Sequence, residues 1–322
     1  MTTVKNYLSL VKFSHTIFAM PFAMIGFALG VASFSLVKAY PAYGGIADFG
    51  QAGREAASLE GAGFLRGMEI SPGELLLRFV LVLVCMITAR SAAMAFNRYL
   101  DRHFDRENPR TAIREIPRGI ISPDHALRFV ILNAVLFIAA TWFINKICFL
   151  LSPVALFVIL FYSYTKRFTP LCHLVLGLGL SLAPIGAYLA VTGRFDVLPV
   201  LFSLAVIFWV SGFDVIYALQ DVEFDRSQRL YSIPSVLGRT KALRVSGLLH
   251  VLSTCCVVAA GIYGGFQWIY WLGIGVFAGM LLYQHAIVKP NDLSRVNIAF
   301  MTANGIASIV FGVLVIADII IN

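Results

Sequence analysis

Long apolar runs, separated by short polar connections, occupy most of this chain. A transmembrane helix needs about 20 predominantly apolar residues to cross the hydrocarbon core of a bilayer. The stretches that approach or exceed this length are 15–38, 74–98, 126–145, 147–165, 171–192, 197–219, 242–263, 267–288 and 295–319. The pattern therefore predicts an all-α, polytopic membrane protein, with about nine transmembrane helices in one bundle.

The composition supports this fold class. Of the 322 residues, 59% are hydrophobic and only 13% are charged, and the mean hydropathy is +0.83. These values exclude an ordinary soluble domain. A bundle in lipid can hold a chain of this length as one domain, so we expect a single domain over residues 1–322. The Gly- and Ala-rich stretch 39–72 is expected to be a flexible external loop insertion.

The distribution of basic residues predicts the orientation in the membrane. The net charge is +8, but Lys and Arg gather in alternate connections between the apolar runs, where membrane topology explains them without a nucleic-acid partner. With the N-terminus inside, the connections near residues 98–118 and 220–244 face the cytoplasm. We therefore expect a multi-pass protein of the cell's inner (cytoplasmic) membrane.

A polar cluster follows the second apolar run. Asn97, Asp101 and Asp105 are spaced four residues apart, so on a continuous helix they lie roughly along one face. Two carboxylates near a helix C-terminus repel each other and oppose the helix dipole. A divalent cation would compensate them.

The arginines of this segment leave a second interpretation open. Arginine recurs every four residues from 98 to 118, partly interleaved with acidic residues. Taken alone, this pattern is also typical of a solvated helix with i,i+4 ion pairs. Pro109 and Pro117 argue against one continuous helix, so part of the segment is expected to form a loop over the membrane surface.

A second acidic cluster lies at the end of the sixth apolar run. Asp214 projects from an apolar helix, and Asp221 and Asp225 follow it. Acids at membrane depth are costly and usually face a cavity. Mg²⁺ prefers oxygen ligands and often binds through one or two carboxylates together with substrate phosphates. Two Asp-x-x-x-Asp pairs on facing helices would thus hold Mg²⁺ ions that bridge a diphosphate.

A diphosphate also requires fixed positive charge. Arg90 lies inside the second apolar run, and an arginine at membrane depth needs a partner or an anionic ligand. Tyr162 and Lys166 have i,i+4 spacing that suits a phosphate clamp, although Lys166 also fits a plain topology signal. Lys12 and His15, at the start of the first run, are candidates for hydrogen bonds to a substrate hydroxyl, or they simply reach toward the membrane surface.

These motifs resemble the signatures of the UbiA superfamily of intramembrane prenyltransferases, most closely its 4-hydroxybenzoate polyprenyltransferase group. The first signature is matched by Asn97-x-x-x-Asp101-x-x-x-Asp105, with Asn108-Pro109-Arg110-Thr111 and Arg114-Glu115-Ile116-Pro117 behind it. The second is matched by Asp221-x-x-x-Asp225. Further matches are Lys12-Phe13-Ser14-His15-Thr16, Arg90 and Tyr162-x-x-x-Lys166.

The resemblance implies a central cavity that opens to lipid, and Mg²⁺-dependent transfer of a polyprenyl group from its diphosphate to an aromatic acceptor. The metal and diphosphate would be held by Asn97, Asp101, Asp105, Asp221 and Asp225. Tyr162 and Lys166 would contact the diphosphate, and Arg90 would face the acceptor, on its carboxylate side. As a separate hypothesis about the mechanism, we expect Asp214 or Asp221 to take the proton that leaves the aromatic ring.

The identity of the acceptor has several candidates. Arg98 follows the motif asparagine, where many relatives carry Asp, and this is similar to the 4-hydroxybenzoate branch. We therefore expect an aromatic acid of the 4-hydroxybenzoate type, in ubiquinone or menaquinone biosynthesis. The same chemistry on 1,4-dihydroxy-6-naphthoate, in the futalosine route to menaquinone, or on haem is the alternative. A membrane transporter with an intramembrane acidic site is the alternative from another class.

Overall fold

The computed structural model describes residues 4–11, 19–39 and 70–322. Lys12, His15 and nearly all of the expected insertion at 39–72 lie outside these residues. Within them the chain is helical apart from turns and one isolated bridge, between Lys289 and Asp292. The all-α fold class predicted from hydropathy is confirmed.

The long helices of the described part are α2 (Met20–Ala39), α4 (Pro72–Leu100), α6 (Pro123–Ile144), α7 (Lys146–Thr165), α8 (Cys172–Thr192), α9 (Val197–Ala218), α11 (Ile233–Tyr263), α12 (Trp268–Ile287) and α13 (Asn304–Ile321). The short elements are α1 (Val4–Leu10), α5 (Arg102–Glu107), the 3-10 helix η3 (Leu219–Asp221), α10 (Val222–Ser227) and the π-helical η4 (Ile298–Ala303). Each of the predicted apolar ranges corresponds to one long helix.

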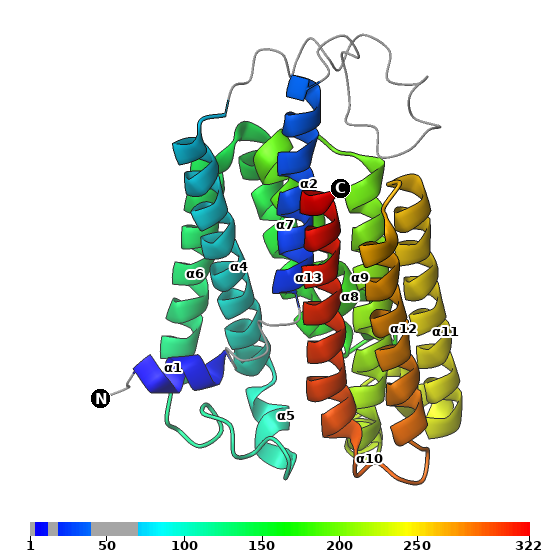
Figure 1. Ribbon diagram of the computed structural model, residues 1–322. Helices are drawn as coiled ribbons and strands as arrows, with labels where there is room; N and C mark the ends of the chain where they lie inside the picture. The colour runs from blue at the N-terminus through cyan, green and yellow to red at the C-terminus, as the bar shows by residue number, and fades with distance from the viewer. Residues whose placement is uncertain (1–3, 12–18, 40–69) are drawn as a thin grey trace.

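Seven helical units in the described residues are long and apolar enough to cross a membrane. They are α4, α6, α7, α8, α9 with its continuation to Ser227, α11, and η4 with α13. The helices α2 and α12 stand beside them in the same bundle (Figure 1). The chain is therefore a multi-pass membrane protein in architecture.

One predicted helix boundary is wrong. The helix expected at 242–263 begins at Ile233, because Ser232 and Ser235 form a capping box there and Pro234 occupies the first turn. Such a box satisfies two backbone N–H groups at a helix start. A kink at Gly238, where φ is +77°, divides this first turn from the apolar part of α11. The capped start places Ser232 against the site described below.

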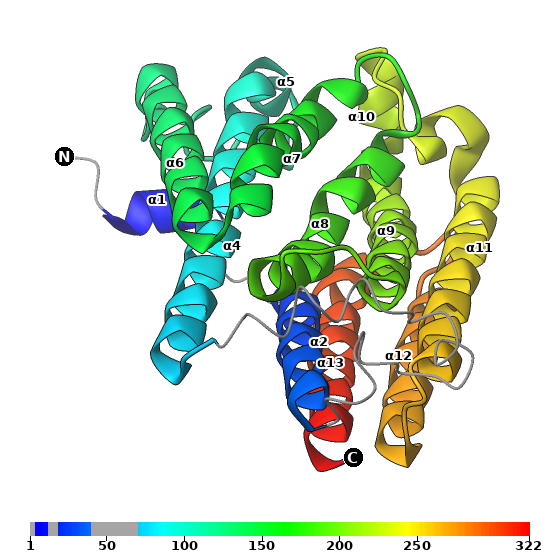
Figure 2. The same cartoon turned by 90° about the horizontal axis from the view of Figure 1, so that it is seen from above.

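The helices form two groups joined by α8. Seen from above, α4, α6 and α7 lie on one side, and α2, α9, α11, α12 and α13 lie on the other (Figure 2). Between them α8 packs against α7 on one face and against α2 and α9 on the other. The short elements α1, α5 and α10 lie at one end of the bundle, and the C-terminus lies at the opposite end (Figure 1).

An aromatic core fills the larger group. Trp209 packs against Phe22 and Phe277, with ring centroids 5.2 Å and 5.9 Å away, and Phe311 contacts both of these phenylalanines. The Trp209 indole N–H donates a 3.0 Å hydrogen bond to Asn304 Oδ1, as a buried indole requires. This half is closely packed.

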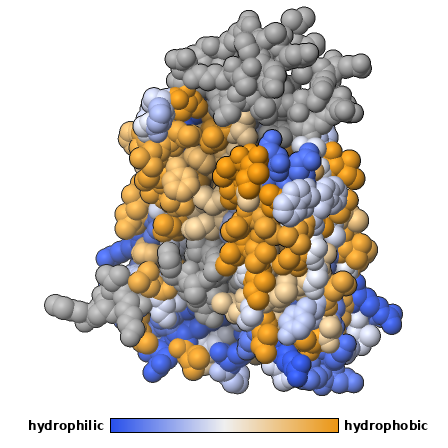
Figure 3. All heavy atoms as spheres, in the orientation of Figure 1, coloured by the Kyte–Doolittle hydropathy of each residue, from blue (hydrophilic) through white to orange (hydrophobic). Residues whose placement is uncertain are grey.

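The outer surface is apolar around the sides and polar at one end. Large side chains of α6 and α7, among them Trp142, Phe143, Leu150 and Phe157, are exposed. Figure 3 shows hydrophobic residues along the sides and hydrophilic residues gathered at the end that carries α5 and α10. An exposed apolar surface of this extent is typical of a lipid-facing bundle.

Candidate active site

A cavity of about 680 Å³ lies between the group formed by α4, α6 and α7 and the helices α8 and α9. All predicted site residues within the described part of the chain line it: Arg90, Asn97, Asp101, Asp105, Tyr162, Lys166, Asp214, Asp221 and Asp225. The cavity has a charged end, near α5 and α10, and a long apolar remainder. The apolar walls include Val82, Met86, Phe137, Ile144, Leu151 and Leu180.

The cavity extends over most of the height of the bundle. Both His173, near the start of α8, and Ala190, near its end, line it. At the helical rise, these positions are about 25 Å apart along α8. The site therefore combines a polar head region with room for an extended apolar group.

The first acidic motif does not form the continuous helical face that its spacing predicts. Helix α4 ends at Leu100, Asp101 has φ −87° and ψ 6°, and α5 starts at Arg102. The break turns Asp101 and Asp105 toward different cations, which relieves the repulsion that two acids on one helix end would feel. Basic side chains of the chain itself thus compensate the acids in this structure.

Asp101 is held by side chains of α4 and of the connection after α7. Arg167 Nη2 donates a 2.9 Å hydrogen bond to Asp101 Oδ1, and Asn97 Nδ2 donates to Oδ2 at 3.2 Å. Arg167 is itself fixed by the Ser163 carbonyl, to which it donates at 2.8 Å. Burial raises the pKa of Asp101, and the charge of Arg167 opposes that shift only in part.

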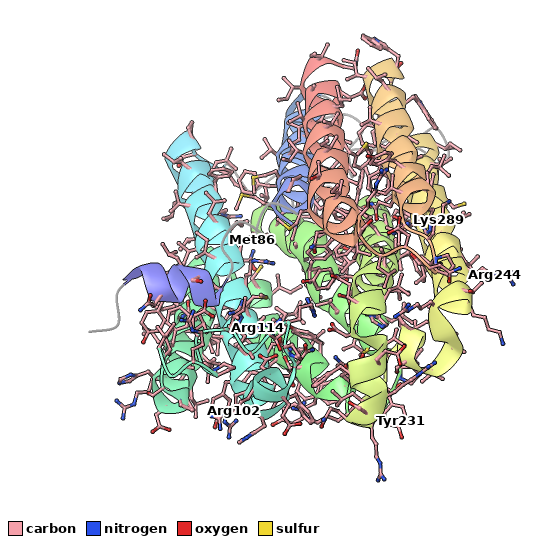
Figure 4. The ribbon with its side chains drawn as sticks, turned by 90° about the horizontal axis from the view of Figure 1, so that it is seen from below. Met86, Arg102, Arg114, Tyr231, Arg244 and Lys289 are labelled. Atoms are coloured by element: carbon pink, nitrogen blue, oxygen red, sulfur yellow. The ribbon has the colours of Figure 1, made fainter. Side chains whose placement is uncertain are left out.

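Asp105 is held by the loop that follows it. Arg114 Nη1 lies 2.8 Å from Asp105 Oδ1 and 2.9 Å from Oδ2. Thr111 Oγ1 donates to the Asp105 carbonyl at 3.2 Å. Figure 4, seen from the end that carries α5 and α10, shows Arg114 toward the inside of the bundle and Arg102 nearer its edge. The 97–118 segment is therefore folded back over the cavity.

Asp221 of the second motif is held from the first motif's loop. Arg110 donates to Asp221 through Nε, at 3.0 Å, and through Nη2, and its Nη1 donates to Tyr217 Oη at 2.9 Å. Asn108 Nδ2 adds a 3.3 Å bond to Asp221 Oδ1. Burial alone would lower the pKa of Arg110, but the charge of Asp221 and their hydrogen bonds raise it. This contact joins the two acidic motifs.

Asp225 is fully buried and holds two side chains. Lys166 Nζ lies 2.7 Å from Asp225 Oδ1, and Ser232 Oγ donates a 2.9 Å hydrogen bond to Oδ2. Burial alone would lower the pKa of Lys166, but the negative charge of Asp225 raises it overall. The predicted clamp lysine is thus charged and points at the second motif.

Asp214 has a histidine partner that sequence inspection does not reveal. His173 Nδ1 lies 2.7 Å from Asp214 Oδ2, across the contact between α8 and α9. The histidine is buried, whereas the Asp214 carboxylate is partly open to the cavity.

Arg90 differs from the other basic residues of the cavity. It lines the cavity on α4, and its buried Nε has no hydrogen-bond partner among the described residues. A buried guanidinium N–H without a partner is costly. Arg90 is therefore the cavity cation most clearly suited to an anionic ligand.

The solvated-helix interpretation of residues 98–118 is wrong, because their ion pairs are not i,i+4 pairs on one helix. Arg98 pairs with Glu115, and Arg114 and Arg110 pair with Asp105 and Asp221. These contacts fold the loop onto the bundle. Glu115 also accepts a hydrogen bond from Ser9 of α1, which docks α1 on this end.

A sequence profile described as the UbiA prenyltransferase family matches residues 64–306. The chain belongs to this family. It is thus a prenyltransferase, as the motifs predicted, and the transporter alternative is set aside.

Curated relatives agree with the assignment of this chain to the UbiA family. It is 31% identical over 223 residues to the 4-hydroxybenzoate octaprenyltransferase of Aeromonas salmonicida, covering 69% of this chain and 76% of that one. It is 29% identical over 241 residues to a protein of the same name from Francisella tularensis, covering 75% and 83%.

Solved structures share the fold of this UbiA family member. A UbiA homolog from Aeropyrum pernix K1 matches with a TM-score of 0.72 and 27% identity, over 95% of this chain and 97% of that one. A UbiA homolog from Archaeoglobus fulgidus bound to DMAPP and Mg²⁺ matches with a TM-score of 0.65 and 20% identity, over 98% and 100%.

The partners of the acids are the part of the site that motif inspection missed. Arg167 could be read only as a topology signal, and nothing in the sequence pairs His173 with Asp214. Arg110 and Arg114 were recognised as parts of a signature but not as partners of Asp221 and Asp105. The one available signal was charge balance, since buried acids need cations nearby.

Proposed function

We propose that this chain transfers a polyprenyl group from polyprenyl diphosphate to an aromatic acid of the 4-hydroxybenzoate type, with Mg²⁺, in quinone biosynthesis. One observation carries the proposal: a single cavity joins paired carboxylates and cations at one end to a long apolar remainder. A diphosphate suits the charged end and a polyprenyl tail suits the apolar walls. The names of the curated relatives support the acceptor class.

The donor set at the charged end fits Mg²⁺. Within residues 4–11, 19–39 and 70–322, no three His, Cys, Asp or Glu side chains gather into a metal cage. Mg²⁺ does not require one, because it commonly binds one or two carboxylates plus substrate phosphates. The oxygens that would hold it belong to Asn97, Asp101, Asp105, Asp221 and Asp225. When bound, Mg²⁺ would supply positive charge against the departing diphosphate.

The basic partners of these acids would bind the diphosphate. Arg110, Arg114 and Lys166 line the cavity, and each lies against one motif aspartate. Together with the Tyr162 hydroxyl, they would donate hydrogen bonds to phosphate oxygens as the C–O bond of the donor breaks. The apolar walls would keep water from the allylic cation that forms.

Arg90 and Asp214 would serve the acceptor. The unpartnered N–H of Arg90 would bind and orient the acceptor's carboxylate. A ring carbon of the acceptor then attacks the allylic cation, and the ring loses a proton. Asp214, with a carboxylate open to the cavity, would take that proton, with Asp221 as the alternative base.

A competition assay tests the proposal. Purified protein is incubated with Mg²⁺, a polyprenyl diphosphate and equal amounts of 4-hydroxybenzoate and 1,4-dihydroxy-6-naphthoate, and the products are identified by mass. We expect prenylated 4-hydroxybenzoate as the main product. A prenylated naphthoate would move the assignment to the futalosine route, and no product from either acid would contradict the acceptor class.

The protein would lie in the inner (cytoplasmic) membrane, with the active-site end of the bundle facing the cytoplasm. Its support is the gathering of basic residues at this end of the bundle. Single cysteines at Glu107, near α5, and at Trp268, at the opposite end, would report the orientation with a membrane-impermeant thiol reagent. Labelling of residue 268 but not of residue 107 in intact spheroplasts is the expected result, and the reverse would contradict it.

A further inference from the structure

His173 is a buried histidine that makes two hydrogen bonds with different parts of the site. Its Nδ1 lies 2.7 Å from Asp214 Oδ2, and its Nε2 lies 3.3 Å from the backbone nitrogen of Ile233. Only about 2% of its surface is exposed. Both ring nitrogens are thus engaged within the protein, and the ring has no other role in the proposed chemistry.

The partners fix the tautomer of His173. A backbone N–H can only donate, so Nε2 must accept the bond from Ile233 and carry no proton. The proton then resides on Nδ1 and is donated to Asp214. A neutral histidine thus supplies one hydrogen bond to the Asp214 carboxylate, whose other side remains open to the cavity.

The second bond of His173 leads to the diphosphate side of the cavity. Ile233 is the first residue of α11, directly after Ser232, whose hydroxyl donates to Asp225 at 2.9 Å. The neighbouring Tyr231 N–H donates to the Lys166 carbonyl at 2.7 Å, and Lys166 Nζ lies 2.7 Å from Asp225. The turn at residues 231–233 is thus tied to both members of the Lys166–Asp225 pair.

We propose that His173 is a positioning residue, which holds the acceptor-side carboxylate and the diphosphate-side turn in one fixed arrangement. Through Nδ1 it orients Asp214, and through Nε2 it anchors the 231–233 turn that supports Asp225 and Lys166. Its effect on either substrate is exerted through these two partners. The inference rests on the proposed function for the identity of the two ligands.

Two substitutions separate the two bonds. The amide of Asn in His173→Asn lies near the position of Nδ1, so it keeps a donor for Asp214 and loses the acceptor for Ile233. The longer Gln in His173→Gln places its amide oxygen near the position of Nε2, so it keeps the acceptor and loses the donor. His173→Ala loses both bonds and gives the baseline.

The experiment measures equilibrium binding of two probes to the full chain in detergent, without turnover. The probes are 4-hydroxybenzoate, and geranyl diphosphate with Mg²⁺. We expect His173→Gln to weaken 4-hydroxybenzoate binding about tenfold and to leave geranyl diphosphate binding nearly unchanged. His173→Asn should do the reverse, and His173→Ala should weaken both. Among variants that remain active, His173→Gln should raise the KM for the acceptor, and His173→Asn should raise the KM for the donor.

A second buried histidine gives the control. His250 is 3% exposed and contacts His285 at 2.9 Å, away from the cavity walls. His250→Asn should alter thermal stability without changing either affinity. Equal losses for both probes in His173→Asn and His173→Gln would show a merely structural role and overturn the proposal, as would wild-type affinities in both variants.

The same data distinguish this inference from the proposed function. A wild-type protein that binds geranyl diphosphate but no aromatic acid would overturn the acceptor class, and with it the acceptor-side role of His173. The wild type could instead bind both probes while each His173 variant changes the two affinities equally. That result would overturn the role of His173 and leave the proposed function intact.

Discussion

The two acidic motifs have the same spacing in sequence but are anchored in different ways. In the first, Asp101 and Asp105 bind arginines from the connection after α7 and from the motif's own loop. In the second, Asp221 binds Arg110 from the first motif's loop, and Asp225 binds Lys166. The second motif therefore takes one of its two cations from the first motif's loop, whereas the aspartates of the first motif take none from the second.

The two motifs share one feature. The side chains of Asp101 and Asp221 are 23% and 12% exposed, whereas those of Asp105 and Asp225 are 7% and 1% exposed. The first aspartate of each pair is thus the more open to a ligand, and the second is the more firmly built into the scaffold. This difference predicts that the two positions fail in different ways when substituted.

The largest expected effect is on turnover, at the open positions. Asp101→Ala and Asp221→Ala should each reduce kcat/KM for prenyl transfer by about a thousandfold or more, which corresponds to about 4 kcal/mol. The reason is the loss of a carboxylate that would bind Mg²⁺. Steady-state kinetics of the purified variants measure the effect.

Glu223 provides the matched control for this prediction. It lies between Asp221 and Asp225 in sequence, is largely exposed, and makes a long 3.8 Å contact with Arg239. Glu223→Ala should retain nearly full turnover. Activity close to that of the wild type in Asp101→Ala or Asp221→Ala would contradict the assigned role of the open aspartates.

The next effect is on stability, at a closed position. Asp225→Asn leaves Lys166 without its counter-charge and weakens the bond to Ser232. We expect a loss of about 2 kcal/mol, below the range for a fully buried pair because Lys166 is partly exposed. Thermal unfolding in detergent measures it. Asp101→Asn should be clearly milder, and an equal loss in the two variants would remove the distinction between open and closed positions.

A smaller effect is expected where the motifs meet. Arg110→Lys keeps the charge but cannot bind Asp221 and Tyr217 together through a planar fork. We expect about a tenfold loss in kcat/KM. Arg106→Lys, in an exposed arginine of the same segment, should behave as the wild type. No difference between the two variants would show that the contact between motifs has no catalytic weight.

The smallest effect is a shift in the pH profile. Burial raises the pKa of Asp101, and the charge of Arg167 opposes this shift. The carboxylate is the form that would bind Mg²⁺, so activity should fall as the pH drops through the raised pKa. Arg167→Gln removes a charge that stabilises the carboxylate, and the acid limb of kcat/KM should move to higher pH. A limb that stays in place or moves to lower pH would contradict this assignment.

Hydropathy and charge could predict the fold and the site's location. The membrane requires long apolar helices, and acids inside such helices are rare enough to indicate a cavity. Asp214 was recognisable on this ground, as was Arg90, whereas Asp101, Asp105, Asp221 and Asp225 were recognisable from their four-residue spacing just after apolar runs. All of them line the cavity.

The pairings could not be predicted in the same way. Arg167 and Asp101 lie far apart in sequence and meet through the packing of α7 on α4, and His173 and Asp214 meet through the packing of α8 on α9. The break at Asp101 was also hidden, because i,i+4 spacing describes a helix face only while the helix continues. The start of α11 at Ile233 is set by the Ser232–Ser235 capping box. The prediction followed the apolar run, which begins only near residue 242, and so placed the helix start too late.

Binding of geranyl diphosphate with and without Mg²⁺ tests the central claim most directly. Isothermal titration would compare the wild type with Asp101→Asn and Asp221→Asn. The account predicts that Mg²⁺ strengthens binding to the wild type at least tenfold, and that this gain is lost in both variants. Equal affinities with and without Mg²⁺, or a full gain retained in both variants, would contradict it.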